Sequence, residues 1–418
     1  MMVETSQPFS NSWEERLAAM QEQDAPYSGM VTWERPEHLP RDGQVATIQH
    51  PLAGKCVPIK DLVDTKGLRT TYGVSTYREH IPETDHPVVT FLRKCGAVLI
   101  GKSNTSSLGA LPVTESDLLG TACNPRDPSK ISGGSSGGAA VLVAAGTVEI
   151  AHGTDAAGSL RIPAACCGVT GWKSTPGLLP ADASSMSERI GIQTHGFIAR
   201  DAALLHGVAS SLYRSGPGIH PKRLIVLDGR PFGGPRTACW DDGLDICSAF
   251  GEQLECPIEV LHLPEEEELM RAFQLFWMNL ACPDSLQDEE LEPHLSEWRR
   301  YAKEYGTKGF DASYRALERF AQRIGEHGTP DTLFIHPTLG TPVPAVGMRE
   351  RYPDPYALFD AGVALSPLGA LANILRRPAV SFPWNGDSAG HKIPHSVTLI
   401  GPAWSDSELL GMVARATL

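Results

Sequence analysis

The cysteines of this chain form no CxxC pair, although nine of them are scattered over the 418 residues. An odd cysteine count argues against a complete disulfide framework, and the missing CxxC spacing argues against a zinc site. We therefore expect reduced thiols, as in a cytoplasmic protein, and no metal centre.

Long apolar runs and clustered positive charge are also missing. The longest apolar stretch, 139–146, is too short to span a bilayer, and the polar, acidic segment 1–15 does not resemble a secretory signal. The 36 basic and 49 acidic side chains give a net charge of −13, and no polybasic patch is visible. We therefore expect neither a nucleic acid nor a membrane as a partner.

The chain has 41% hydrophobic residues and no internal repeat or low-complexity tract, so it is long and apolar enough to bury a large core. Caps and periodicity predict helices at about 13–23, 84–94 (with Thr84-Asp85 as the N-cap), 137–145, 201–212 and 241–254. Apolar runs predict strands at about 97–100, 148–151, 223–227, 258–261, 332–335, 379–382 and 396–400. This alternation predicts an α/β fold, a layered α/β/α sandwich around a central mixed sheet flanked by helices.

Two serines lie in loops of small residues. Ser135 belongs to SGGSSGG at 132–138, and Ser159 belongs to GTDAAGSLRIP at 153–163. Upstream, Lys60 stands in VPIKDL at 57–62. A hydroxyl becomes a nucleophile when a nearby base removes its proton, and glycine-rich backbone can bring N–H donors around the resulting oxyanion. The sequence therefore offers hydroxyls, a candidate base and candidate oxyanion loops.

The glycine-rich segment 132–138 has three other possible interpretations. A flexible linker does not suit its tight enclosure by regular elements, and a Walker A phosphate loop would end in Gly-Lys-Ser/Thr, whereas this loop continues Gly138-Ala139. The segment also fits Gly-x-Ser-x-Gly, the nucleophile elbow of α/β-hydrolases. That fold needs a strand directly before the motif and a late histidine; 124–132 is polar and contains two prolines, while His391 and His395 are available. The elbow interpretation is therefore disfavoured.

Taken together, these segments resemble the amidase signature family, whose members hydrolyse or transfer amides through a Ser–Ser–Lys triad. The resemblance spans most of the chain in the family's order, through 54–73, 101–104, 124–125, 133–172, 196–201 and 399–402. It implies that Lys60 is the base, Ser135 the bridging serine and Ser159 the nucleophile. It also implies a cis Gly134–Ser135 peptide, and no metal or organic cofactor.

The resemblance assigns further roles around the nucleophile. The backbone N–H groups of Ala156, Ala157, Gly158 and Ser159 would hold the oxyanion. Ser136, Asp155 and Arg161 would support the loops. The family usually reads Gly-Thr-Asp-Thr-Gly-Gly-Ser here, so Ala157 could block a backbone angle open only to glycine. If the backbone angle at Ala157 is ordinary, the Ala157 N–H can still donate to the oxyanion. Two serines also replace common family residues: Ser132 a proline and Ser107 a glutamate.

Lys60 must be neutral to act as a base, whereas a free lysine titrates near about 10.4. A solvated Lys60–Asp61 pair would stay charged. The apolar flanks 57–59 and 62–63 instead suit a buried loop, and burial disfavours the charged amine.

The predicted activity is hydrolysis of a small-molecule amide to a carboxylate and ammonia or an amine. Two alternatives remain open: the glutaminase subunit of a tRNA-dependent amidotransferase, and a hydrolase of a carbamoyl or urea-like compound. We expect one domain, 1–418, with a catalytic core at about 46–212 and 330–418 and a variable pocket region at about 213–330. Pocket residues are expected within 108–113 and 185–194. The run 273–278 is expected to pack in the core rather than to place Phe276, Trp277 or Met278 in the pocket. A dimer is common in the family, so a homodimer is an alternative to a monomer.

Overall fold

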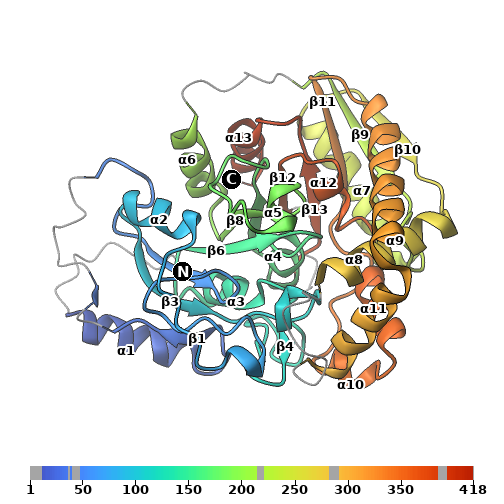
Figure 1. Cartoon of the computed structure of the whole chain (residues 1–418). Helices are drawn as coiled ribbons and strands as arrows, with labels where there is room; N and C mark the ends of the chain where they lie inside the picture. Colours follow the sequence, from blue (N-terminus) through green and yellow to red (C-terminus); the bar gives the residue numbers. More distant parts are fainter. Residues whose placement is uncertain are drawn as a thin grey trace.

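An eight-stranded mixed sheet runs through the computed structural model, which describes residues 12–35, 38–39, 48–213, 221–281, 291–384 and 393–417 (Figure 1). Its strand order is β10-β9-β11-β13-β12-β7-β8-β6. β10, β9 and β11 are parallel to one another, and the remaining neighbours are antiparallel. The strands of this sheet are β6 (Ile150–Asp155), β7 (Thr170–Lys173), β8 (Thr194–Ala199), β9 (Arg223–Asp228), β10 (Ile258–His262), β11 (Thr332–Pro337), β12 (Ala379–Pro383) and β13 (Ser396–Ile400).

A smaller three-stranded sheet lies beside β6, and a short hairpin completes the strands. The small sheet has the order β1-β3-β2, with β2 parallel to β3. Its strands and those of the hairpin are β1 (Met30–Trp33), β2 (Cys56–Lys60), β3 (Val98–Ser103), β4 (Glu115–Ser116) and β5 (Gly120–Thr121). Because β2 contacts β6, the last residue of β2 comes close to the edge strand of the large sheet.

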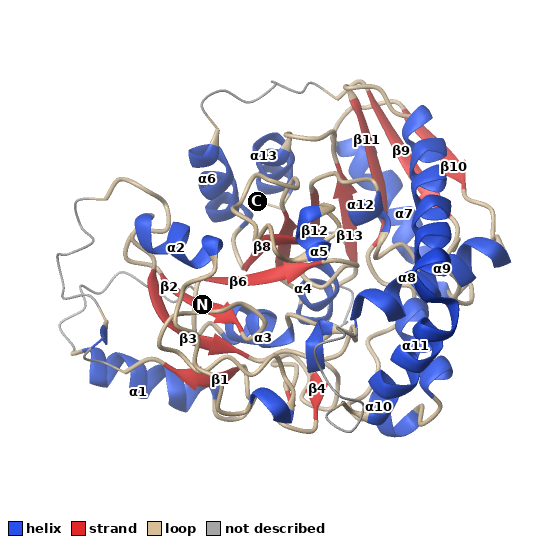
Figure 2. Cartoon of the chain, in the orientation of Figure 1, coloured by secondary structure: helices blue, strands red, loops and turns tan. Residues whose placement is uncertain are grey.

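Helices cover both faces of the large sheet (Figure 2). They are α1 (Trp13–Asp24), α2 (Pro87–Lys94), α3 (Gly137–Ala145), α4 (Arg161–Cys167), α5 (Met186–Arg189), α6 (Ala202–Leu212), α7 (Ala238–Gln253), α8 (Glu267–Ala281), α9 (Pro293–Glu326), α10 (Met348–Arg351), α11 (Pro355–Leu365), α12 (Leu371–Ile374) and α13 (Asp406–Ala416), with short 3-10 turns at Ser75–Tyr77 and Ser107–Gly109. The long helix α9 is kinked at Gly306, whose φ is 58°. Within the described residues, no helix is both long and apolar enough to cross a membrane.

The layers follow from period-two alternation along the buried strands. On β9, Ile225 and Leu227 join the core shared with α8, α9 and α11, while Leu224 and Val226 join the core shared with α2, α6 and α13. Successive strand residues point to opposite faces, so a strand that is apolar throughout fills both cores. The predicted α/β/α sandwich around a mixed sheet is confirmed.

Most predicted elements are present, with shifted ends. The predicted strand 148–151 is observed as β6 at Ile150–Asp155, and 97–100 as β3 at Val98–Ser103. The predicted N-cap Thr84-Asp85 is wrong: the His86 side chain accepts the Val88 N–H, and Pro87 occupies the first turn. Asp85 instead accepts from the Lys66 N–H and from Arg93. The buried loop predicted around Lys60 is wrong in part, because Lys60 is buried but ends strand β2.

The predicted division of the chain near 213 and 330 stays a prediction. The segment between those positions supplies two strands of the large sheet, β9 and β10, and the pair of packed helices α8 and α9. In Figure 1 these helices stand along one side of the molecule with α11.

Candidate active site

Lys60 lies fully buried at the end of β2, facing β6. Its Nζ atom is 2.7 Å from the Ser135 Oγ and 3.0 Å from the Thr154 Oγ1. Burial lowers the Lys60 pKa to about 7, although the negative charge of Asp155 acts in the opposite direction. Near neutral pH a large share of this amine is therefore unprotonated, so Lys60 can accept a proton from the hydroxyl beside it.

The glycine-rich segment before α3 is a tightly packed turn. Gly133 has a φ of 74°, and the Gly134–Ser135 peptide is cis. A Cβ on Gly134 would lie 2.7 Å from the Val113 backbone, and one on Gly137 would lie 2.2 Å from the Thr114 Oγ1. These contacts are incompatible with a flexible linker. Residues 124–132 form turns and isolated bridges, so the strand that a nucleophile elbow requires is absent there.

The second serine loop connects the end of β6 to the start of α4. The carbonyl oxygen of Ser159 accepts the Ser136 N–H at 3.1 Å, and the Ser136 Oγ donates to the Thr154 carbonyl at 3.2 Å. These bonds hold the two serine loops against each other. Ser135 and Ser159 line the same cavity, with exposed fractions of 1% and 8%. The structure therefore brings Lys60, Ser135, Ser136 and Ser159 together.

Asp155 and Arg161 form a buried ion pair that closes the nucleophile loop. Arg161 donates to both Asp155 carboxylate oxygens at 2.9 and 3.1 Å, and also to the Gly369 carbonyl and the Asn373 Oδ1. Burial alone would raise the Asp155 pKa, but Arg161 and Lys173 together with a hydrogen bond from Gly158 lower it to about 2. The Asp155 carboxylate is thus fixed as an anion that organises the loop.

The backbone of this loop decides which N–H groups face a ligand. The Gly158 N–H donates to the Asp155 Oδ1 at 2.8 Å, so this amide is already engaged and does not fit the predicted oxyanion role. Gly158 takes the left-handed angle, with a φ of 105°, whereas Ala157 has no positive φ. Within the described part of the chain, the N–H groups of Ala156, Ala157 and Ser159 have no acceptor. These three amides remain as candidate oxyanion donors.

Two chambers meet at Ser159. The polar chamber is lined by Leu62, Leu108, Gly109, Ser135, Thr154, Ala156, Ser159, Ser187, Gln193, Trp277, Leu280 and Ala281. The aromatic chamber is lined by Ala110, Leu111, Pro112, Ala157, Ser159, Ile162, Phe232, Phe273, Trp277, Phe359, Gly362, Val363, Ser366, Pro367 and Ala370. None of these lining residues carries a charge or a conventional metal ligand such as histidine, cysteine or a carboxylate.

The chambers test several expectations about the pocket. Residues from both predicted ranges, 108–113 and 185–194, line them. Trp277 lines both chambers, so its expected place in the core alone is wrong; Phe276 and Met278 are buried and line neither. Thr154 was not predicted as a site residue. It lies three residues beyond the end of the predicted strand 148–151, whereas β6 continues to Asp155 and brings the Thr154 hydroxyl beside Lys60.

This chain is similar in sequence and in fold to several known proteins. A sequence model of the amidase family matches residues 33–217. The chain is 30% identical over 411 residues to a subunit of the glutamyl-tRNA(Gln) amidotransferase of Natronomonas pharaonis, covering 86% of this chain and 94% of the relative. It is 28% identical over 403 residues to fatty acid amide hydrolase of Arabidopsis thaliana, covering 87% and 64%. The structure of 6-aminohexanoate cyclic dimer hydrolase has the same fold, with a TM-score of 0.79 at 24% identity over 96% of this chain and 92% of that one.

Proposed function

The chain belongs to the amidase signature family, and we propose from this premise that it hydrolyses the C–N bond of a small, neutral amide. The products would be a carboxylate and ammonia or an amine. The observation that carries the proposal is the buried Lys60 amine, 2.7 Å from the Ser135 hydroxyl in a cavity that Ser159 also lines.

In the proposed reaction, protons move along the triad while Ser159 attacks. Neutral Lys60 accepts the proton of Ser135, Ser135 accepts that of Ser159, and the Ser159 Oγ bonds to the amide carbon. The N–H groups of Ala156, Ala157 and Ser159 stabilise the oxygen, which becomes negatively charged in the tetrahedral intermediate. The C–N bond then breaks as Ser135 returns a proton to the leaving nitrogen. Water attacks the acyl-enzyme by the same route, releasing the carboxylate and restoring Ser159.

The lining of the two chambers supports a neutral substrate. Burying an unpaired charge away from water costs more than burying an unpaired neutral polar group, which itself costs on the order of 2–7 kcal/mol. Among the described residues, none that lines the two chambers offers a charged partner. The aromatic side chains Phe232, Phe273, Trp277 and Phe359 instead suit a hydrocarbon or aryl portion.

The similarity to the amidotransferase subunit of Natronomonas pharaonis favours a second candidate. In that case the chain would release ammonia from glutamine within a larger complex. Glutamine carries an ammonium and a carboxylate, and the described linings supply neither an anion nor a cation to pair with them. A carbamoyl or urea-like compound is neutral and fits the same linings, so it remains within the proposed substrate class.

The test is release of ammonia, amine and carboxylate at pH 8 from neutral aliphatic and aryl amides, carbamoyl compounds and glutamine. Wild type, Ser159→Ala and Ser248→Ala are compared. Ser248 lies on α7, away from the chambers, and serves as the matched serine control. We expect hydrolysis of a neutral amide by wild type and by Ser248→Ala, and a loss of at least about 10³-fold in Ser159→Ala. Activity confined to glutamine, or retained in Ser159→Ala, would overturn the proposal.

A further inference from the structure

The polar chamber has two polar side chains that the triad mechanism does not use. Ser187 and Gln193 line it beside Ser135 and Ser159, whereas its remaining non-catalytic walls are formed by apolar residues, Thr154 and Gly109. Both come from the segment around α5, which leads into β8. The Ser187 carbonyl oxygen accepts the N–H groups of Ile192 and Gln193 at 3.0 Å, so the two wall residues are joined through the backbone.

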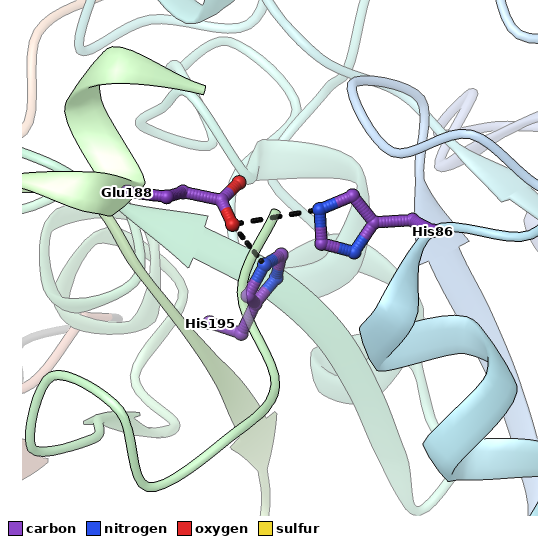
Figure 3. Close-up of side chains that lie close together, drawn as sticks. All are labelled: His86, Glu188 and His195. Carbon is purple, nitrogen blue, oxygen red and sulfur yellow. Dashed lines mark hydrogen bonds and ion pairs between the residues drawn. The ribbon is translucent and has the colours of Figure 1, made fainter. Parts of the chain in front are cut away.

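Glu188 lies between them in sequence and anchors this segment to two other elements (Figure 3). Its Oε2 is 3.3 Å from the His195 Nε2 on β8 and 3.4 Å from the His86 Nε2 at the start of α2. The same carboxylate accepts the Asp182 N–H at 2.7 Å, and its Oε1 accepts the Gln193 Nε2 at 3.2 Å. We call Glu188, His86 and His195 the clamp.

Two histidines and a carboxylate this close together could be a metal site, but the hydrogen bonds argue otherwise. The His86 Nδ1 accepts the Val88 N–H at 3.2 Å, so its proton must be on Nε2, the atom facing Glu188. A ring in that tautomer has no lone pair to offer a cation there. Metal-bound histidines instead donate from their second nitrogen. The contacts are those of a carboxylate that accepts a hydrogen bond from His195 and lies 3.4 Å from the His86 Nε2.

The protonation of the remaining members agrees with this assignment. Burial lowers the pKa of His195, so its ring is neutral. With its Nε2–H directed at Glu188, its Nδ1 accepts from the His152 Nε2 at 3.1 Å. Burial alone would raise the pKa of Glu188, but its interactions with the nearby His195 and His86 rings outweigh burial and hold that pKa below its usual value. The carboxylate is therefore ionised and only accepts.

Because the Glu188 carboxylate only accepts hydrogen bonds, it fixes the direction of the Gln193 amide. Its NH₂ group must turn toward Glu188, which leaves the carboxamide oxygen and the second N–H for a ligand in the chamber. Among the described residues, no other side-chain hydrogen bond of Gln193 is formed. A site built to pair a neutral polar group discriminates strongly against an apolar analogue, because its own polar atoms would be left unpaired.

We propose that Gln193 and Ser187 form a recognition wall for a neutral hydrogen-bonding group of the substrate, and that the clamp positions Gln193 for this role. The inference rests on the proposed function and narrows its substrate class. The amide would carry a hydrocarbon or aryl portion for the aromatic chamber and an uncharged polar group, such as a carbamoyl, for the polar chamber. Gln193 would be a specificity residue, and Glu188 a positioning residue that acts through it.

The test compares isosteric amide pairs. One pair is benzoylglycinamide and N-isobutylbenzamide, in which a carbamoyl replaces an isopropyl group on the amine side. The reversed pair is the anilides of malonamic acid and isovaleric acid, with the same exchange on the acyl side. We expect wild type to prefer the carbamoyl member of at least one pair about 10-fold or more in kcat/KM. In Gln193→Met we expect that preference to disappear, because the kcat/KM of the carbamoyl member falls more than that of the apolar member.

A double-mutant cycle then tests the clamp. Glu188→Gln keeps the size of the side chain but offers an N–H as well as a carbonyl. We expect it to lower the preference in the wild-type background and to add nothing in the Gln193→Met background. If the two substitutions lower the preference by independent factors that multiply in the double variant, Glu188 acts elsewhere, and its positioning role is overturned. Activity that falls with EDTA and returns with Zn²⁺ would mean that the clamp is a metal site and overturn its assignment as a hydrogen-bonded anchor.

Calorimetric binding of the same pairs to Ser159→Ala separates this inference from the proposed function. Preferential binding of the carbamoyl member without hydrolysis by wild type would contradict the proposed function and leave the recognition wall standing. Equal binding of both members, or binding of neither, would overturn the recognition wall even if wild type hydrolyses amides.

Discussion

The chemistry of the site depends most on how Lys60 is enclosed. Its amine meets two hydroxyls, on Ser135 and Thr154, and the nearest charge that influences it is the carboxylate of Asp155. That carboxylate is already paired with Arg161. Burial therefore outweighs the favourable charge, and the amine loses its proton near neutral pH.

The pH profile of kcat/KM should report this ionisation. Lys60 acts in its neutral form, so activity should be low below its pKa of about 7 and rise tenfold per pH unit as pH approaches it from below. A plateau should follow above about pH 8. The profile is measured from pH 5 to 10 on a neutral amide, because kcat/KM reports groups of the free enzyme. A profile that is flat across pH 6–8 would contradict a neutral-lysine base.

Two neighbouring residues in the oxyanion loop should respond differently to substitution. Ala157→Gly should change kcat less than about threefold, because Ala157 has an ordinary φ and its N–H is kept. Gly158→Ala should lower kcat, because a Cβ at a φ of 105° would also lie 2.9 Å from the Ile162 Cδ1, and such strain costs on the order of 1–3 kcal/mol. Steady-state kinetics of the two variants decides; equal effects would contradict this account of the loop.

At this scale the sequence, through its family resemblance, predicted the residues that meet in the site but not every donor among them. Lys60, Ser135 and Ser159 belong to short sequence motifs that can be recognised, with their spacing, without a structure. The engagement of the Gly158 N–H by Asp155 is a matter of loop geometry, which residue type alone does not specify. Trp277 comes from helix α8, far along the chain from the triad. Its neighbours Phe276 and Met278 are also large and apolar but are buried in the core, so residue type alone does not tell which of the three lines the pocket.

Among the elements, α3 and the turn before it depend on glycines at positions where neighbouring atoms leave no room for a side chain. Gly137 begins α3, and a Cβ there would lie 2.2 Å from the Thr114 Oγ1 and 2.6 Å from the Ser132 Oγ. Ser132 is one of the departures from the family pattern, and its hydroxyl fills part of this space. The turn is therefore packed to its limit, which keeps Ser135 at a fixed distance from Lys60.

Gly137→Ala should destabilise the protein by about 1–3 kcal/mol, as expected for overpacking of a closed site. Gly325→Ala is the matched control. Gly325 lies within α9 with nothing within 4 Å of its added Cβ, so alanine should be neutral or stabilise by up to about 1 kcal/mol. Urea denaturation of both variants gives the comparison. Equal stability of the two variants would refute tight packing around Gly137.

Element prediction succeeded where local pattern and tertiary environment agree. The predicted helix 201–212 and strand 396–400 are examples: α6 spans Ala202–Leu212 with Asp201 as its N-cap, and β13 spans Ser396–Ile400. It failed at α2, where His86 rather than Thr84-Asp85 caps the helix because Asp85 binds Lys66 and Arg93. Strands β7 and β8 were not predicted. Their buried residues include Lys173 and His195, which interrupt the apolar pattern; their partners include the Arg377 carbonyl and the Glu188 carboxylate, respectively.

For the whole molecule, the site gathers segments from distant parts of the chain. Lys60 comes from the small sheet, the serines from the loops around β6, and the aromatic chamber from α8, α11 and their neighbours. The described residues that line both chambers all come from this one chain. Whether the chain forms a homodimer stays a prediction from the resemblance.

The purified chain should therefore hydrolyse neutral amides without a partner protein, tRNA or ATP. The measurement is specific activity across successive purification steps, with light scattering to give the mass of the active species. Constant activity in a species containing this chain only is the expected result. Activity that disappears on purification and returns with a copurifying protein would favour the amidotransferase candidate instead.

The most direct test of the central claim is to identify the nucleophile chemically. A fluorophosphonate probe bonds its phosphorus to an activated serine oxygen and releases fluoride, and peptide mass spectrometry then locates the adduct. We predict one adduct, on Ser159, that is absent in Ser159→Ala and forms at least about 10²-fold more slowly in Lys60→Met, because the base is lost. An adduct on Ser135 or Ser136, or labelling of Ser159 at an unchanged rate in Lys60→Met, would contradict the account.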